Sequence, residues 1–418
     1  MKDNWEECLF EKETSLITKG TTPTSLGKEF KESGINFIKA ESITNAGNFI
    51  PESFAFIDEE THEILKRSQL QVDDILFSIA GVLGRIAVVD KTIIPANTNQ
   101  ALALIRLSNS SILDRDYIKY YLNGAFIKDQ IRRINVQAAQ ANFSLGDIGR
   151  LNIQYPPLLQ QQKIAKILST VDKVIEKTES AIAKYQAIKQ GLMHDLFTRG
   201  IDVKTGKLRP TPKDAPELYK ESIFGLIPRD WEEMTFGDEI NFLSGCPFSS
   251  VFFNEEKRGM PLIRIRDLIS SSQETYYNGV YSDSYLIKEG DVLIGMDGDF
   301  HIVKWKNSAS LLNQRILKIS EKKEGKLYLD YFFYYLFPFL LDVHNKTAAT
   351  TVKHLSTKDI SGATRFMPLK SEQILSAKKI LSIDNKIQTE QQALAKYQQL
   401  KAGLLQDLLT GKVEVSVD

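Results

Sequence analysis

The chain repeats itself at about half its length. The segment IAKYQAIKQGLMHDLFTRG begins at Ile182, and the related segment LAKYQQLKAGLLQDLLTGK begins at Leu394, 212 positions later in a chain of 418 residues. Self-similarity at a fixed spacing is typical of one structural unit that is used twice. Each half of the chain must therefore build the same framework from different residues.

Four further pairs of short segments recur in the same order. They are NWEE at Asn4 and DWEE at Asp230, DILFSIAG at Asp74 and DVLIGMDG at Asp291, Asn99-Gln100 and Asn313-Gln314, and NFSLGDIG at Asn142 and HLSTKDIS at His354. Their offsets vary between 212 and 226 positions, which indicates small loop insertions on a shared fold.

Each repeat begins with a part of mixed character. Short β-branched runs, such as residues 81–90 and 101–107, alternate with Gly, Asn and Ser turns and with short helical stretches such as residues 116–122. We therefore expect an α+β fold with two similar mixed α/β domains. The glycine pairs Gly81/Gly84 and Gly295/Gly298 are interpreted as turn glycines with positive φ.

Each repeat ends with a long amphipathic helix. Apolar side chains recur at alternating steps of three and four, with Thr178 and Lys189 filling two positions of the first seam. The predicted seam residues are Ile164, Leu168, Val171, Ile175, Ile182, Tyr185, Leu192 and Leu196 in the first helix, and Ile380, Ile383, Ile387, Leu394, Tyr397, Leu404 and Leu408 in the second.

The ends of these helices are marked by prolines and glycines. Pro156-Pro157 and Pro368 precede the two helices, and Gly200 and Gly411 follow them. A helix over residues 158–198 would be about 60 Å long. A single apolar seam is compatible with an ordinary amphipathic helix that lies on a domain. Two seams with matched spacing favour an antiparallel coiled-coil pair with pseudo-two-fold symmetry.

These patterns predict six parts of the chain. They are a first globular domain at 1–155, a first long helix at 156–200, a linker at 201–217, a second globular domain at 218–368, a second long helix at 369–411, and a tail at 412–418.

Composition excludes several classes of protein. The chain has 53 basic and 53 acidic residues, with 42% hydrophobic and 25% charged residues, as is usual for a globular protein. Its two cysteines, Cys8 and Cys246, exclude a disulfide framework and a cysteine-rich zinc site. The first ten residues do not resemble a signal peptide, and the most apolar run, residues 329–341, is too short and interrupted to cross a bilayer. We expect a cytoplasmic protein with reduced thiols and no membrane partner.

No catalytic motif is found. The sequence has no GxxxxGK[ST] loop, no GxGxxG fingerprint and no GxSxG elbow, and its five histidines form no HExxH or HxH pair. We therefore expect neither catalysis nor a metal site, and the symmetric layout favours a reader or scaffold.

Polar side chains that can read base edges cluster in repeat-related turns. Asn and Gln pair with adenine, whereas Arg and Lys pair with guanine or phosphate. The candidates are Lys19, Thr21, Thr22, Lys39, Ser78, Arg85, Asn99, Gln100, Gln137, Gln140 and Asn142 in the first domain, and Arg264, Arg266, His301, Asn313, Gln314, Arg315, Thr351, Lys353 and His354 in the second.

These residues can also be explained without DNA binding. Runs of Asn, Gln and Thr are usually solvated loops, and the Asn-Gln pairs can equally cap turns in both repeats. The first 150 residues carry 17 basic and 20 acidic side chains. Strong DNA binding by this domain would therefore need a basic partner.

The ordered set of features resembles the DNA-specificity subunit of type I restriction-modification systems. The resemblance covers almost the whole chain. It rests on the duplicated layout, the WEE motifs at Trp5 and Trp231, the DILFSIAG and DVLIGMDG turns, and the PPLLQQQKIAKIL and AKYQ…GLMHDLF helices.

The resemblance implies a non-catalytic subunit that serves in defence against foreign DNA. Its globular parts would be target recognition domains that read the two halves of a bipartite, asymmetric site in double-stranded DNA, and its helices would be the spacers. It would dock two modification subunits, which use S-adenosylmethionine to methylate adenine. Two restriction subunits, which use ATP and Mg for translocation and cleavage, would join through them.

One departure from the family pattern lies at the start of the second helix. This helix reads SEQILSAKKIL from Ser371 in place of the QQxKIAxIL start, so we expect its first turn to pack differently.

Two other functions stay open. One is a coiled-coil adaptor between proteins, and the other is a specificity-like subunit of another defence enzyme.

Overall fold

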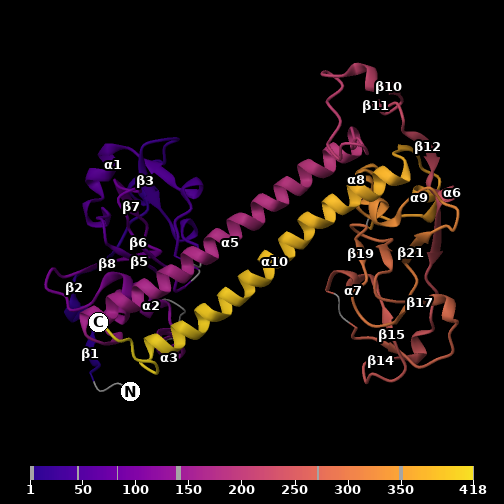
Figure 1. Ribbon diagram of the computed structural model, residues 1–418. Helices are drawn as coiled ribbons and strands as arrows, with labels where there is room; N and C mark the ends of the chain where they lie inside the picture. The colour runs from indigo at the N-terminus through magenta and orange to yellow at the C-terminus, as the bar shows by residue number, and fades with distance from the viewer. Residues whose placement is uncertain are drawn as a thin grey trace. The chain divides into compact units, whose positions relative to one another are not determined.

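The computed structural model describes residues 4–44, 47–81, 83–137, 143–270, 273–347 and 352–417. The chain divides into two units, which are treated separately. Unit 1 comprises Met1–Ser180 and Gln391–Asp418, and unit 2 comprises Ala181–Glu390. Each unit holds one globular part and portions of both long helices (Figure 1). This division differs from the six predicted parts because each long helix contributes to both units.

Unit 1 is built on one four-stranded antiparallel sheet and one three-stranded sheet. The strand orders are β2-β8-β5-β6 and β4-β3-β7, and β1 pairs separately with β9. The strands are β1 (Glu6–Leu9), β2 (Thr14–Lys19), β3 (Ile35–Ile38), β4 (Ala55–Ile57), β5 (Ile75–Ser78), β6 (Ile86–Val88), β7 (Ala96–Thr98), β8 (Leu102–Leu107) and β9 (Asn152–Tyr155). The shorter helices are α1 (Glu59–Ile64), α2 (Arg115–Asn123), α3 (Ala125–Gln137) and α4 (Leu145–Gly149).

Unit 2 repeats this plan. Its four-stranded sheet has the order β13-β21-β18-β19, its five-stranded sheet has the order β14-β16-β15-β20-β17, and β12 pairs with β22. The strands are β10 (Tyr219–Ser222), β11 (Gly225–Pro228), β12 (Glu232–Thr235), β13 (Ile240–Ser244), β14 (Phe253–Asn254), β15 (Met260–Ile263), β16 (Tyr276–Tyr277), β17 (Leu286–Ile287), β18 (Val292–Gly295), β19 (Ile302–Lys304), β20 (Ser310–Leu312), β21 (Ile316–Glu321) and β22 (Thr364–Met367). The shorter helices are α6 (Phe236–Glu239), α7 (Ile265–Ser270), α8 (Leu329–Lys346) and α9 (Thr357–Ser361). The prediction of two similar mixed α/β domains is confirmed.

The NFSLGDIG and HLSTKDIS segments each begin a short helix. Ser144 and Ser356 begin α4 and α9 with the same capping box, in which the serine side chain accepts from the backbone of Asp147 or Asp359 and the aspartate accepts in return. The repeat therefore preserves a way to start a short helix.

The DILFSIAG and DVLIGMDG segments preserve an ion pair. Asp74 is buried and contacts Arg106 through two hydrogen bonds of 2.7 Å, while Asp291 lies 2.6 Å from Lys318. Both carboxylates also accept from a backbone N–H three residues earlier. These aspartates thus join the turn before β5 or β18 to the neighbouring strand β8 or β21.

The prediction of turn glycines with positive φ is confirmed at three of the four positions. Gly81, Gly84 and Gly298 have φ of 74°, 85° and 76°. Gly295 does not share this conformation, because it is the last residue of β18 and pairs with Ile316 of β21. Its prediction as a positive-φ turn residue is wrong.

The two long helices are α5 (Leu158–Thr198) and α10 (Lys370–Leu409). In unit 1 the start of α5 packs with the end of α10, as Leu168 and Leu408 share one core cluster. In unit 2 the end of α5 packs with the start of α10, as Leu196 and Ile380 share another. The helices are therefore antiparallel, as predicted.

The described seam positions are all at least half-buried. The deeply buried ones are Ile164, Leu168, Ile182, Leu196, Ile380, Ile387 and Leu408. The half-buried ones are Val171, Ile175, Tyr185, Leu192, Ile383, Leu394, Tyr397 and Leu404.

The segment predicted as a linker packs into unit 2. Ile201 is fully buried, and the Arg209 guanidinium forms a bidentate pair with Glu372 at 2.5 and 2.9 Å. Glu372 also accepts from the backbone N–H of Ile201 at 2.7 Å, and Arg209 reaches Asp230 at 2.6 Å. This network fastens the chain after α5 to the first turn of α10.

The first turns of α5 and α10 share one arrangement despite the sequence departure at Ser371. Gln161 accepts from the backbone N–H of Asp114 at 2.8 Å, and Gln373 accepts from that of Tyr328 at 2.7 Å. Each side-chain amide also donates to two backbone carbonyls. The expectation of different packing is wrong for these glutamines, and the difference lies at Glu372, where the first repeat has Gln160.

Among the described residues, no helix is long and apolar enough to cross a membrane.

Candidate nucleic-acid interface

Each unit has one edge where two parallel strands end together. In unit 1, β3 and β7 are parallel, and Lys39 and Asn99 follow them. In unit 2, β15 and β20 are parallel, and Arg264 and Asn313 follow them. We call these two places the strand-end edges. The carboxyl ends of parallel strands are common ligand-binding positions in α/β sheets.

A glycine brings a loop into close contact with each strand-end edge. A Cβ atom on Gly20 would lie 1.6 Å from the carbonyl oxygen of Thr98, and one on Gly245 would lie 1.9 Å from that of Asn313. The backbone N–H of Gly20 also donates to Asn99 at 3.2 Å. Only glycine permits this approach, so both repeats place the residues after β2 or β13 over the edge.

In unit 1 this loop forms a polar cluster. The Thr22 hydroxyl donates to the side-chain oxygen of Gln100, and Arg67 donates to the Thr21 hydroxyl at 3.1 Å. Gln100 and Lys19 are exposed. The loop after β2 thus contacts two segments that are distant in sequence, through Thr22 with Gln100 and through Thr21 with Arg67.

Arg67 was missed by sequence reasoning. It lies in the short 3₁₀ turn Lys66–Ser68, which has no counterpart among the recurring segments. Lys39 was predicted, and its ammonium lies 4.9 Å from the centre of the Phe30 ring.

In unit 2 the corresponding turn continues into an ionic cluster. Gln314 and Arg315 are exposed, and Arg315 has a φ of 69°, which is rare for a residue other than glycine. Its Nε lies 3.9 Å from Asp297, and Nδ1 of His354 lies 2.5 Å from the same carboxylate. Asp297 was missed, although it belongs to the recurring DVLIGMDG segment.

His301 and Lys353 lie in the adjoining part of unit 2. His301 lies 3.8 Å from Asp299, which is also 3.7 Å from His344 of α8. The Lys353 ammonium donates to the His344 carbonyl at 2.6 Å, so it stabilises the end of α8.

The two arginines of the LIRIRDL segment have different surroundings. The backbone N–H of Arg264 donates to Asp267 at 2.8 Å, while its Nε is buried and finds no acceptor among the described residues. Arg266 is exposed and lies 3.6 Å from Asp267 and 4.0 Å from Glu274. An unsatisfied Nε is costly to bury, whereas the exposed Arg266 is the more accessible of the two side chains.

Several predicted contact residues have structural roles instead. Ser78 is fully buried and accepts from the backbone N–H of Arg85 at 2.7 Å. The Arg85 guanidinium donates to the carbonyls of Ala40 and Ile43 at 3.2 and 2.9 Å. Because Ser78 has no exposed surface, its prediction as a base contact is wrong.

The two asparagines of the Asn-Gln pairs cap their own turns. The Asn99 side chain accepts from the backbone N–H of Ala101 at 3.1 Å, and that of Asn313 accepts from Gln314 at 2.9 Å. This is the alternative that the sequence left open. The glutamines Gln100 and Gln314 are the exposed members of each pair.

Some predicted residues are not described. Gln140, Asn142 and Thr351 lie outside the described residues. Gln137 is the last residue of α3. Among the residues that the structure does describe, no group of three His, Cys, Asp or Glu side chains gathers as metal ligands.

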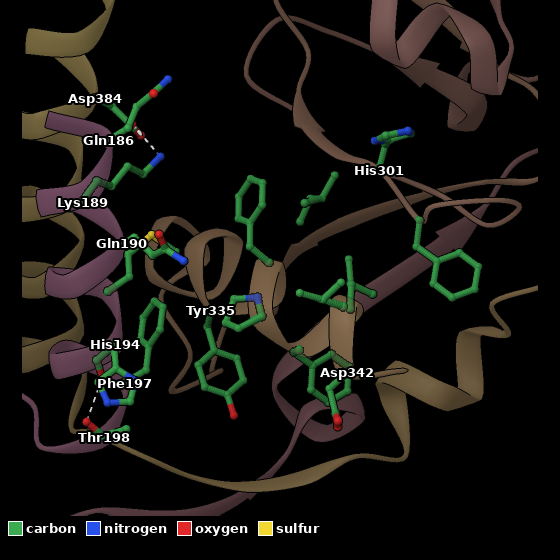
Figure 2. A pocket seen from close by; sticks show the side chains of 18 of the residues that line it. Gln186, Lys189, Gln190, His194, Phe197, Thr198, His301, Tyr335, Asp342 and Asp384 are labelled. Atoms are coloured by element: carbon green, nitrogen blue, oxygen red, sulfur yellow. Dashed lines mark hydrogen bonds and ion pairs between the residues drawn. The ribbon is translucent and has the colours of Figure 1, made fainter. Parts of the chain in front are cut away.

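Unit 2 also carries a groove of about 980 Å³ beside α5 and α8 (Figure 2). It is lined by apolar side chains that include Met193, Phe197, Phe337 and Leu341, together with His301. Phe337 and Leu341 are 41% and 61% exposed. Such exposed apolar side chains on a groove are typical of a surface that another protein covers.

The comparisons with known proteins agree with this duplicated geometry. The family model of the type I restriction modification DNA specificity domain matches residues 9–185 and 228–399. The EcoBI specificity subunit of Escherichia coli is 34% identical over 200 residues, which is 47% of this chain and 42% of that protein, so this match spans less than half of the relative. The MjaVIII specificity subunit of Methanocaldococcus jannaschii is 25% identical over 326 residues, which is 73% of this chain and 72% of that protein.

A solved structure shares the fold. The type I restriction-modification S subunit from M. genitalium has a TM-score of 0.59 at 16% identity, with 99% of this chain and 97% of that chain covered. The family model covers most of the chain in two blocks, one for each repeat. The chain therefore belongs to the DNA specificity family of type I restriction-modification systems.

Proposed function

We propose that the chain reads a bipartite, asymmetric DNA target, with one recognition domain in each unit reading one half of it. The observation that carries this proposal is the strand-end edge. Both repeats form it from two parallel strands and a closely approaching glycine, but the side chains around it differ. Lys39 follows β3 in unit 1, whereas Arg264 follows β15 in unit 2. Beside them, unit 1 has the Thr21–Arg67 contact, whereas unit 2 has Asp297 with Arg315 and His354. Different donors and acceptors select different bases, so the two halves of the target differ.

The chain would contribute recognition and not catalysis. Two modification subunits, bound to S-adenosylmethionine, would extrude and methylate the target adenines, since a base inside a duplex is not accessible to an enzyme. Two restriction subunits would supply ATP- and Mg-dependent translocation and cleavage. The acidic balance of the first 150 residues supports a requirement for partners that add positive charge.

The first experiment is a map of adenine methylation in the host genome with and without this gene. We expect a split, asymmetric motif that disappears on deletion and returns on complementation. If purified chain and methyltransferase together select no DNA sequence, the protein–protein adaptor becomes the better interpretation. The neighbouring genes distinguish a different defence enzyme, since a methyltransferase and a helicase-nuclease should be encoded beside this one.

The exposed glutamines provide a matched pair of variants. Gln100→Ala is expected to relax base selection in one half of the motif, and Gln314→Ala in the other half only. Each lost base contact should weaken discrimination by about 1–3 kcal/mol at its position. Methylation mapping of the two complemented strains measures both effects. The independence of the two domains fails if one variant alters both half-sites.

The groove in unit 2 is our candidate for the contact with a modification subunit. Leu341→Asp places a charge on an exposed apolar surface of α8 and should weaken co-purification with the methyltransferase about tenfold or more. Ile269→Asp is the control, because Ile269 is 65% exposed on α7 and does not line the groove. Equal binding by both variants would remove the groove from the proposal.

A further inference from the structure

One polar contact occurs twice, once in each unit, at repeat-related positions. In unit 1 the Tyr120 hydroxyl donates to Asp172 at 2.7 Å, and the Lys401 ammonium lies 2.6 Å from the same carboxylate. In unit 2 the Tyr334 hydroxyl donates to Asp384 at 2.7 Å, and Lys189 lies 2.6 Å from it. We call each set a Tyr–Asp–Lys clasp.

Each clasp joins three separate segments. Its tyrosine comes from the globular part, on α2 in unit 1 and on α8 in unit 2. Its aspartate comes from the long helix that follows that globular part, and its lysine comes from the other long helix. Figure 2 shows the Lys189–Asp384 contact of unit 2. The clasp therefore holds a recognition domain against both helices at one point.

The repeat explains the symmetry of the two clasps. Asp172 and Asp384 are 212 positions apart, as are Lys189 and Lys401. Each long helix thus gives its aspartate to one clasp and its lysine to the other. Lys189 fills a position of the predicted apolar seam, where a charged side chain weakens packing unless it has a partner.

The surroundings make these contacts stronger than ordinary surface pairs. Tyr120 and Tyr334 are only 6% and 3% exposed, and the four charged side chains are between 23% and 30% exposed. Burial raises the pKa of both tyrosines, with the hydrogen bond to aspartate acting in the same direction, so the hydroxyls stay protonated as donors. Hydrogen bonds to a charged, partly buried acceptor are directional and comparatively strong.

From this geometry we infer that Tyr120, Asp172 and Lys401, and likewise Tyr334, Asp384 and Lys189, are positioning residues that make the complex accept one gap length between its two half-sites. The inference rests on the proposed function. The length of the helices sets the number of base pairs between the two half-sites. The clasps fix the orientation in which each domain is held on the helices. Without the clasps, each domain still reads its own bases but tolerates duplexes in which the halves are one base pair too close or too far.

The test uses the purified complex of the full chain with its methyltransferase partner. Duplexes carry the wild-type half-sites with the natural gap, or with the gap changed by one or two base pairs, and the methylation rate is measured on each. The main variant is Asp172→Ala/Asp384→Ala, which removes all four clasp contacts. We expect its preference for the natural gap over its neighbours to fall about tenfold, because each recognition domain loses its charge-assisted tyrosine–aspartate hydrogen bond to the long helices. The bases selected within each half should stay unchanged.

Matched controls lie one helical turn away. Tyr117→Phe removes a hydroxyl on α2 that donates to the Gln154 carbonyl at 2.9 Å, inside the recognition domain. Tyr331→Phe removes a buried hydroxyl on α8 that has no partner among the described residues. Both should keep the natural gap preference. Asp172→Asn/Asp384→Asn should restore part of it, because an amide oxygen still accepts from the tyrosine.

The outcomes are distinct. A lower melting temperature with an unchanged gap preference overturns the inference and leaves the clasps a purely stabilising role. If the aspartate variant does not assemble, Tyr120→Phe/Tyr334→Phe decides the question, since it removes only two oxygen atoms; a relaxed gap supports the inference and a strict gap overturns it. If the wild-type complex itself methylates no bipartite target, the proposed function fails instead.

Discussion

Glu372→Gln is expected to lower the free energy of unfolding of unit 2 by about 3 kcal/mol, because it leaves the buried Arg209 guanidinium without its main anionic partner. Arg209 and Glu372 side chains are only 9% and 1% exposed. The expected value lies at the lower end of the usual range for broken buried pairs, since Asp230 still contacts Arg209 at 2.6 Å. Hydrogen exchange of peptides from unit 2 measures the change.

Two further variants separate burial from charge. Asp342→Asn breaks the exposed pair between Asp342 and Lys346 on α8 and should cost less than about 1 kcal/mol. Arg209→Leu/Glu372→Leu removes both buried charges and should recover most of the stability lost in Glu372→Gln. A double variant that is less stable than the single one would mean that the ion pair itself stabilises unit 2.

This pair also explains the sequence departure at the start of the second helix. Glu372 stands where the first repeat has Gln160, and it accepts from both Arg209 and the backbone N–H of Ile201. A Cβ on Gly200 would lie 2.0 Å from the Glu372 carboxylate, and Gly200 has a φ of 65°. The glycine predicted as a helix stop is thus also required for the close approach of Glu372.

Local patterns predicted the long helices well. The heptad spacing and the flanking prolines depend only on neighbouring residues, so the bounds of α5 and the burial of its seam follow from them. The strand-end edges could be predicted only in part. Gln100 and Gln314 are exposed there, whereas Ser78, predicted as a base contact because it is a polar residue in a repeat-related turn, is fully buried.

Contacts between distant segments could not be predicted. Arg67 approaches Thr21 across 46 positions, and no recurring segment marks it. Lys189 stood out as a charged residue in an apolar seam, but its partner Asp384 is 195 positions away. A single sequence shows such a residue to be unusual, while the choice of its partner depends on how the helices pair.

Gln161→Leu is expected to destabilise unit 1, and Gln373→Leu to destabilise unit 2, each by about 3 kcal/mol. Each substitution leaves three backbone groups without this hydrogen bond, of which the proline carbonyl is in a buried contact and the other two are in part-buried contacts. Both glutamines are fully buried. Leucine matches glutamine closely in size, so the loss reports the unsatisfied polar groups and not a cavity. Peptide-resolved hydrogen exchange assigns each loss to its unit.

Exposed glutamines on the same helices serve as controls. Gln162→Leu on α5 and Gln388→Leu on α10 make the same chemical change at exposed positions and should alter stability by less than about 0.5 kcal/mol. We also expect the losses of stability in Gln161→Leu and Gln373→Leu to be equal. Gln161 and Gln373 make equivalent contacts to three backbone groups, although the two helix starts otherwise differ in sequence. A large loss in one unit and none in the other would show that the two repeats, although alike in geometry, do not share this means of fastening a recognition domain to its helix.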